Sequence, residues 1–240
     1  MSDETAPSTA AAAAEPEAKR RAMEVFARAD EATDPEFALK LYLQGLALFP
    51  NVAEPCWAGL LEAAKRRRQR GGKTPGAMER MKFEATKSSL ARRNPQAGLV
   101  GAADLWARDP QNVEYLQAAV ACAHAAGFAE AARWLAAELV VMNAERPEPV
   151  PRAFLIAADV YEATSLYADA CDAVERYLRI VPDDHARQKR LTDLQARGKI
   201  EDGTFIRRAR ENVRPARDGA PSPSAAAPNA RTRAIEQAKA

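Results

Sequence analysis

The sequence predicts an all-α protein. Apolar residues make up 47% of the chain but aromatic residues only 6%, so alanine supplies much of the apolar content. Alanine has the highest helix propensity, and no run of alternating β-branched residues indicates a strand. The stretch between Pro110 and Pro182 also carries the same helix–turn–helix pattern of apolar residues twice, which indicates helices packed in repeated pairs.

The N-terminal part of the chain predicts a segment without a core, followed by one helix pair. Residues 1–16 are mainly Ala, Pro, Ser, Thr and acidic residues, which cannot bury enough apolar surface to fold, so we expect disorder there. Residues 19–50 show two apolar stripes. Asp34 and Pro35 lie between the stripes and fit the N-cap and first position of the second helix.

The next part of the chain predicts three helices and one basic loop. Residues 52–64 and 77–93 are expected to form the two helices of an interrupted pair. The insertion between them, residues 65–76, is rich in Arg, Lys and Gly and is expected to be a flexible loop. Residues 96–108 predict one further helix, and the sequence leaves its partner open.

Two more helix pairs follow, over residues 113–146 and 151–184. Residues 183–197 are amphipathic and highly charged, which is typical of a helix that covers the end of a repeat array with a polar face. A short extra helix is expected within residues 198–213. The Pro-, Ser- and Ala-rich residues 214–240 are expected to form a disordered basic tail.

The helical domain, expected over residues 17–197, resembles the tetratricopeptide repeat family. Repeats of that family have about 34 residues, with small and aromatic residues at fixed positions of two helices. Ala157 and Ala158 stand where the family usually has Leu-Gly. The resemblance implies an α-α superhelix, or solenoid, in which small residues lie where paired helices touch and aromatic residues fill the space between repeats. The matching repeat-packing residues are Ala38, Ala132, Phe154, Tyr161, Tyr167, Ala170 and Pro182.

The resemblance also implies a function, that of a protein–protein interaction scaffold. Such repeats bind a peptide or a partner helix in a concave groove lined by the first helix of each pair. Gln117 and Leu155 stand where one subgroup of the family needs Lys or Asn to grip a terminal carboxylate, so that clamp is not implied. Three of the implied groove residues are acidic, which favours a basic or amphipathic partner. The implied groove residues are Glu114, Gln117, Ala121, His124, Arg152, Leu155, Asp159 and Glu162.

The net charge of +2 conceals an acidic body between basic segments. Residues 109–184 contain 13 acidic and five basic residues, whereas residues 207–240 contain eight basic and three acidic ones. Basic segments suit contact with polyanions, so association with nucleic acid remains an alternative function. Neither basic segment offers an obvious set of aromatic side chains for base stacking, which argues against sequence-specific binding of single strands. The basic residues of the expected loop are Lys65, Arg66, Arg67, Arg68, Arg70 and Lys73.

The sequence indicates no enzyme, cofactor or metal site. Gly72-Lys73-Thr74 resembles part of a phosphate-binding loop, but Arg67 stands where that loop needs glycine, and a helix rather than a strand precedes it. His124 and His185 have no acidic or thiol partners in a recognisable nucleophile motif. The three cysteines lie far apart without metal-ligand spacing and are expected to be buried thiols.

The expected location of the protein is the cytoplasm. Asp3 and Glu4 stand where a secretory signal would need basic residues. No stretch approaches the roughly 18 consecutive apolar residues of a membrane span. The odd number of cysteines suits no disulfide framework and favours a reducing compartment. The excess of Arg over Lys and the high Ala content are typical of proteins from GC-rich bacterial genomes.

Overall fold

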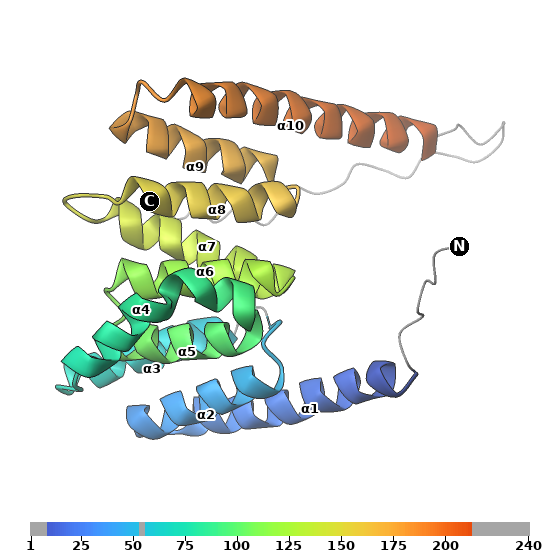
Figure 1. Cartoon of the computed structure of the whole chain (residues 1–240). Coiled ribbons are helices and arrows are strands. Elements are labelled where there is room, and N and C mark those ends of the chain that lie inside the picture. The colour runs from blue at the N-terminus through green and yellow to red at the C-terminus, as the bar shows by residue number, and fades with distance from the viewer. Residues whose placement is uncertain (1–8, 53–55, 213–240) are drawn as a thin grey trace, which may run out of the picture. The chain divides into compact units, whose positions relative to one another are not determined.

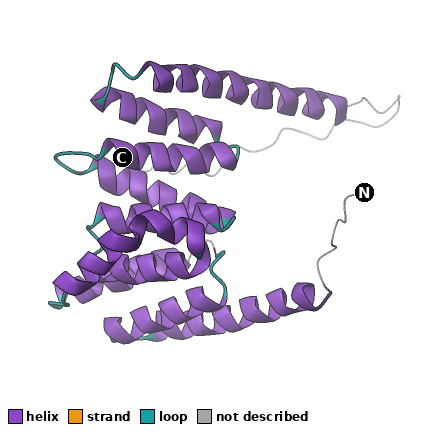
Figure 2. Ribbon diagram, in the orientation of Figure 1, coloured by secondary structure: helices purple, strands orange, loops and turns teal. Residues whose placement is uncertain are grey.

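In the described part of the chain, helices joined by loops are the only regular secondary structure, and there is no β-strand (Figures 1 and 2). This computed structural model describes residues 9–52 and 56–212. The predicted all-α class is therefore confirmed for these residues. The helices are α1 (Thr9–Glu31), α2 (Pro35–Leu48), α3 (Cys56–Gln69), α4 (Ala77–Arg93), α5 (Pro95–Arg108), α6 (Val113–Ala125), α7 (Ala129–Ala144), α8 (Pro151–Ala163), α9 (Tyr167–Ile180) and α10 (His185–Asn212).

The chain divides at Ile200 into two units, of which the first contains α1 to α9 and the start of α10. Within this first unit, each helix from α4 to α8 packs against the next helix along the chain. In addition, α6 contacts both α4 and α8. The first helices of successive pairs therefore lie next to one another, with α6 in the middle of the series.

Short polar side chains begin several of these helices. The Asp34 carboxylate accepts a hydrogen bond from the Phe37 backbone N–H at 3.0 Å, with Pro35 at the first helical position, as the sequence predicted. Asn94 caps α5 and Asn112 caps α6 in the same manner. Each cap satisfies a backbone donor that the helix leaves unpaired, so the boundaries of these helices follow from local chemistry.

Small side chains at the expected repeat positions lie in the core. Ala38 and Ala170 are 0% exposed and Ala132 is 1% exposed, so no water separates the helices at these points. The aromatic residues Phe154 and Tyr161 are also buried. The remaining two repeat-packing residues differ, because Tyr167 is half-buried against the core and Pro182 is exposed: the turn that contains Pro182 lies at the surface.

The pairing expected for residues 52–64 and 77–93 is wrong. The first of these helices continues as α3 to Gln69, and it packs on α2, α5 and α7, whereas α4 packs on α5 and α6. The cause is a cluster of three tryptophans. Trp57 of α3 stacks on Trp134 of α7 with ring centroids 6.3 Å apart, and Trp106 of α5 meets Trp134 edge-on at 6.5 Å. Burying these large rings directs α3 away from α4.

Both ends of the described chain are more helical than expected. Residues 1–16 were predicted to be disordered, but α1 begins at Thr9, where a run of alanines favours helix. Residues 183–213 were predicted to form two separate helices, yet α10 is continuous. A single glycine such as Gly198 lowers helix stability by only about 1 kcal/mol, so it does not end the helix. The predicted tail at residues 214–240 lies outside the described residues.

We expect Ala170→Leu to lower the free energy of unfolding by about 1–3 kcal/mol, because Ala170 is fully buried and a larger side chain overpacks the contact between helices. Ala168→Leu is the matched control, since Ala168 lies on the same helix but is exposed. Urea unfolding of both variants measures the difference. Equal stabilities would contradict the close helix contact at Ala170.

Candidate functional site

A cavity of about 310 Å³ lies between α4, α6 and α8. Most of its lining is apolar, and three polar side chains complete it. The sequence predicted four of the lining residues as groove residues, namely Glu114, Gln117, Ala121 and Arg152. The full lining consists of Phe83, Glu114, Gln117, Ala118, Ala121, Val150, Arg152 and Ile156.

A second cavity, of about 370 Å³, adjoins the first. The two share the lining residues Glu114 and Val150. Their lining residues along α6 run from its N-cap Asn112 to Ala121, about 14 Å of helix at a rise of 1.5 Å per residue. We call the two cavities together the α6 groove. The second cavity is lined by Asp109, Gln111, Asn112, Val113, Glu114, Arg146 and Val150.

Two buried side chains fix the walls of the α6 groove. Asn143 is 0% exposed, and its side-chain amide bonds both backbone groups of Val150: Nδ2 donates to the carbonyl at 3.0 Å, and Oδ1 accepts from the N–H at 2.9 Å. This pair of bonds anchors the proline-containing connection between α7 and α8. On the other wall, the Phe83 ring packs edge-on against Tyr115, with centroids 4.8 Å apart. The cavity is therefore bounded by ordered side chains.

Two hydrogen-bond donors of the α6 groove have no partner among the described residues. The Gln117 Nε2 atom is buried and makes no hydrogen bond. Arg152 is exposed, and no described residue forms an ion pair with it. A buried donor without an acceptor costs about 1–3 kcal/mol, which applies to Gln117, whereas the Arg152 guanidinium is exposed and open to an external acceptor.

Asp159 and Glu162 form ion pairs with α10, which the prediction did not include, while the Asp159 side chain remains 55% exposed. Arg190 of α10 contacts Asp159 at 2.7 Å and Glu162 at 2.8 Å, and Arg197 contacts Glu162 at 2.8 Å. Burial opposes the charge of Arg190, but the hydrogen bonds to both carboxylates outweigh it and raise the pKa of the guanidinium. The prediction assigned the α10 charges to solvent. In the structure they neutralise the acidic face of α8.

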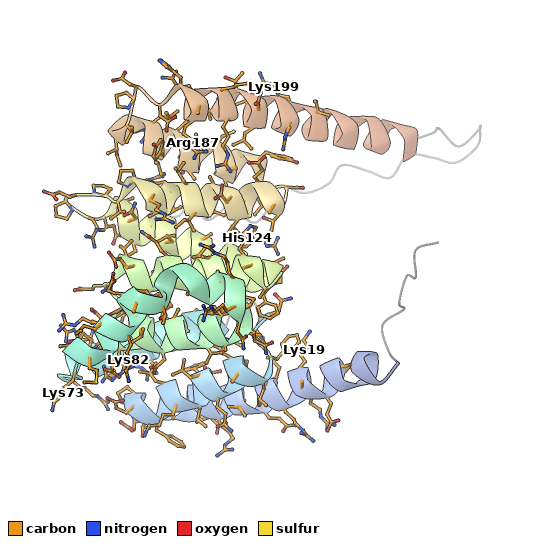
Figure 3. The ribbon with its side chains drawn as sticks, viewed as in Figure 1. Lys19, Lys73, Lys82, His124, Arg187 and Lys199 are labelled. Carbon is orange, nitrogen blue, oxygen red and sulfur yellow. The ribbon has the colours of Figure 1, made fainter. Side chains whose placement is uncertain are left out.

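Two other predicted groove residues lie outside both cavities. His124 is exposed near the end of α6, where Figure 3 labels it, and Leu155 is half-buried on α8. Neither contributes to the lining of the α6 groove. The structure adds Phe83 and Val150, which the sequence did not indicate, because α4 was assigned to a different helix pair and Val150 to a connection.

One of the six basic residues expected to contact polyanions is buried. Arg67 is 6% exposed; its Nε donates to Glu36 at 2.6 Å and its Nη1 to the Arg108 carbonyl at 3.4 Å. It therefore ties α3 to α2 and α5 and is unable to reach an external ligand. The basic residues 65–76 were expected to form a loop. In the structure, α3 continues to Gln69 and Arg67 lies on its buried side. The five exposed members are Lys65, Arg66, Arg68, Arg70 and Lys73.

The described residues contain no group of three His, Cys, Asp or Glu side chains placed to hold a metal ion. Burial, with the nearby Asp30 charge as a second cause, raises the pKa of the Cys56 thiol to about 11. Burial alone raises that of Cys122 to about 11, so both thiols stay protonated near neutral pH. In the same part of the chain, no helix is long and apolar enough to cross a membrane.

Comparisons of the chain with protein-family models, with curated proteins and with solved structures gave no match.

We expect Glu162→Ala to loosen α10, because this carboxylate accepts from both Arg190 and Arg197. Loss of these charged hydrogen bonds should lower the free energy of unfolding by roughly 1–2 kcal/mol. It should also speed amide hydrogen exchange in residues 185–200. Glu148→Ala is the control, since Glu148 is an exposed connection residue. Unchanged exchange in α10 would show that the two arginines do not hold it.

Proposed function

We propose that this protein is an interaction scaffold that binds a peptide or helix of a partner protein in the α6 groove. The observation that carries the proposal is the apolar cavity whose walls come from three different helices, α4, α6 and α8. A partner segment that fills such a cavity buries apolar surface against ordered side chains, which is the usual source of binding energy in protein interfaces.

The same proposal includes a tetratricopeptide-like superhelix in the cytoplasm. The contacts of α6 with α4 and α8, and the pairing of α8 with α9, support the superhelix because they place first helices side by side. A groove along the first helices is the surface that such arrays use for peptides. The scaffold proposal needs no catalytic group and no cofactor.

The proposed partner segment is amphipathic. Phe83, Ala118 and Ile156 offer an apolar surface, so the partner must supply at least one apolar side chain to the cavity. The exposed Arg152 guanidinium offers donors, which suit a backbone or side-chain carbonyl of the partner. A basic partner is less favoured than the sequence predicted, because Asp159 and Glu162 form ion pairs with Arg190 and Arg197.

The test replaces Ala121 with photoreactive benzoylphenylalanine and identifies the segment that crosslinks to it. Binding of that segment, made synthetically, is then measured by calorimetry. We expect Ile156→Arg to weaken binding at least about tenfold, or 1.4 kcal/mol, because a long charged side chain would occupy the apolar cavity.

Ile180→Arg is the matched control, because Ile180 is an exposed isoleucine of α9 outside the α6 groove. It should leave the affinity unchanged. The helical circular-dichroism signal of both variants should equal that of the parent protein. Equal affinities of the Ile156 variant and the parent protein would mean that the ligand occupies another surface.

A further inference from the structure

The side of α4 that faces away from α6 carries exposed apolar residues. Phe83 is the buried side chain of α4 and packs against Tyr115 of α6. Met78 and Met81 are 70% and 72% exposed. At about 100° per residue, Met78, Met81 and Ala85 form one stripe, and Phe83 points in roughly the opposite direction. These spacings of three and seven residues are typical of a helix that packs against a second helix.

Basic residues lie along one side of this stripe, and the exposed Glu84 lies on its other side. Lys82 lies one turn beyond Met78, and Arg92 and Arg93 fall on the same side of the helix near its end. All three are exposed, and no described residue forms an ion pair with them. Lys73 precedes α4, and Figure 3 labels it on the same side of the view as Lys82. We call Met78, Met81, Lys82, Ala85, Arg92 and Arg93 the α4 outer face.

The order of helices explains why the α4 outer face is uncovered. α6 has α4 on one side and α8 on the other. α4 packs on α5 and α6, but no first helix lies on its other side. The preceding helix α3 packs instead on α2, α5 and α7, with Trp57 stacked on Trp134. The position next to α4 that would continue the series of first helices is thus left to solvent, and the methionines lie there.

We propose that the α4 outer face docks an amphipathic helix with acidic flanks, supplied by a partner protein. The helical spacing of the stripe fits a second helix. Methionine side chains adapt to varied apolar surfaces, and the lysine and arginines attract carboxylates and fix the register. This surface is distinct from the α6 groove, so the inference does not depend on the proposed function.

The same residues argue against two other occupants. Nucleic acid makes no use of an apolar methionine stripe, since phosphate contacts come from cations. An anionic membrane would need bulkier side chains such as Trp, Phe or Leu on the apolar side.

The experiment titrates the full-length protein into two fluorescent helical peptides. Both peptides have Leu at the positions of their apolar stripe; one has Glu on both flanks, and the other has Lys in place of every Glu. We expect the Glu peptide to bind and the Lys peptide to bind at least about tenfold more weakly. Met78→Ser combined with Met81→Ser should weaken the Glu peptide about tenfold, since the apolar contact is lost.

A charge reversal distinguishes the contribution of the basic residues to binding from that of the methionines. Lys82→Glu combined with Arg93→Glu should weaken the Glu peptide and strengthen the Lys peptide. The controls are Met23→Ser and Arg28→Glu on α1, which alter an exposed methionine and an exposed arginine elsewhere. Ile156→Arg should also leave the Glu peptide unaffected, which keeps this result independent of the α6 groove.

Three results would overturn the proposal. The first is equal binding of the Glu and Lys peptides, or binding of neither. The second is full binding by the methionine double variant. The third is that an oligonucleotide or a vesicle of anionic lipid binds in place of the Glu peptide, with loss on charge reversal but not on the methionine changes. That pattern would assign the basic residues to a polyanion. Because the substituted side chains of α4 and α1 are exposed, the unfolding midpoints of those variants should match the parent protein.

Discussion

Direct contact between helices at buried alanines is the feature on which the rest of this structure depends. At Ala132 and Ala170 the buried side chain is a single methyl group, so neighbouring helices pack closely at these points. Ala132 lies on α7, which packs on both α6 and α8, and Ala170 lies on α9, which packs on α8. A larger residue at these points would change the spacing and, with it, the shape of the α6 groove.

Polar contacts then decide which parts of the surface remain open. Asn143 anchors Val150 and so holds one wall of the α6 groove in place. Arg190 pairs with the acidic residues Asp159 and Glu162 of α8, and the buried Arg67 pairs with Glu36. Arg152 is exposed and has no ion-pair partner among the described residues. The acidic charge of α8 is therefore compensated by α10, whereas Arg152 leaves a charged donor available in the α6 groove.

The sequence predicted the helical class, the cap at Asp34 and four residues of the α6 groove. These features are local, because helix caps and the spacing of apolar residues act within one or two turns. It missed the contacts that join distant segments. The stacking of Trp57 on Trp134 and the pairing of Glu162 with Arg197 bring together residues whose adjacency no local pattern encodes. The assignment of α3 and the charge of the groove were therefore wrong.

Binding of the partner in the α6 groove is tested most directly by methyl NMR spectroscopy. The protein is titrated with the partner segment that the crosslinking experiment identifies. Val150 and Ile156 line the α6 groove, whereas Ile180 lies on α9 outside it. If the partner fills the groove, the methyl signals of Val150 and Ile156 should shift on titration while that of Ile180 stays in place. Shifts at Ile180 with unchanged signals from Val150 and Ile156 would contradict binding in the α6 groove.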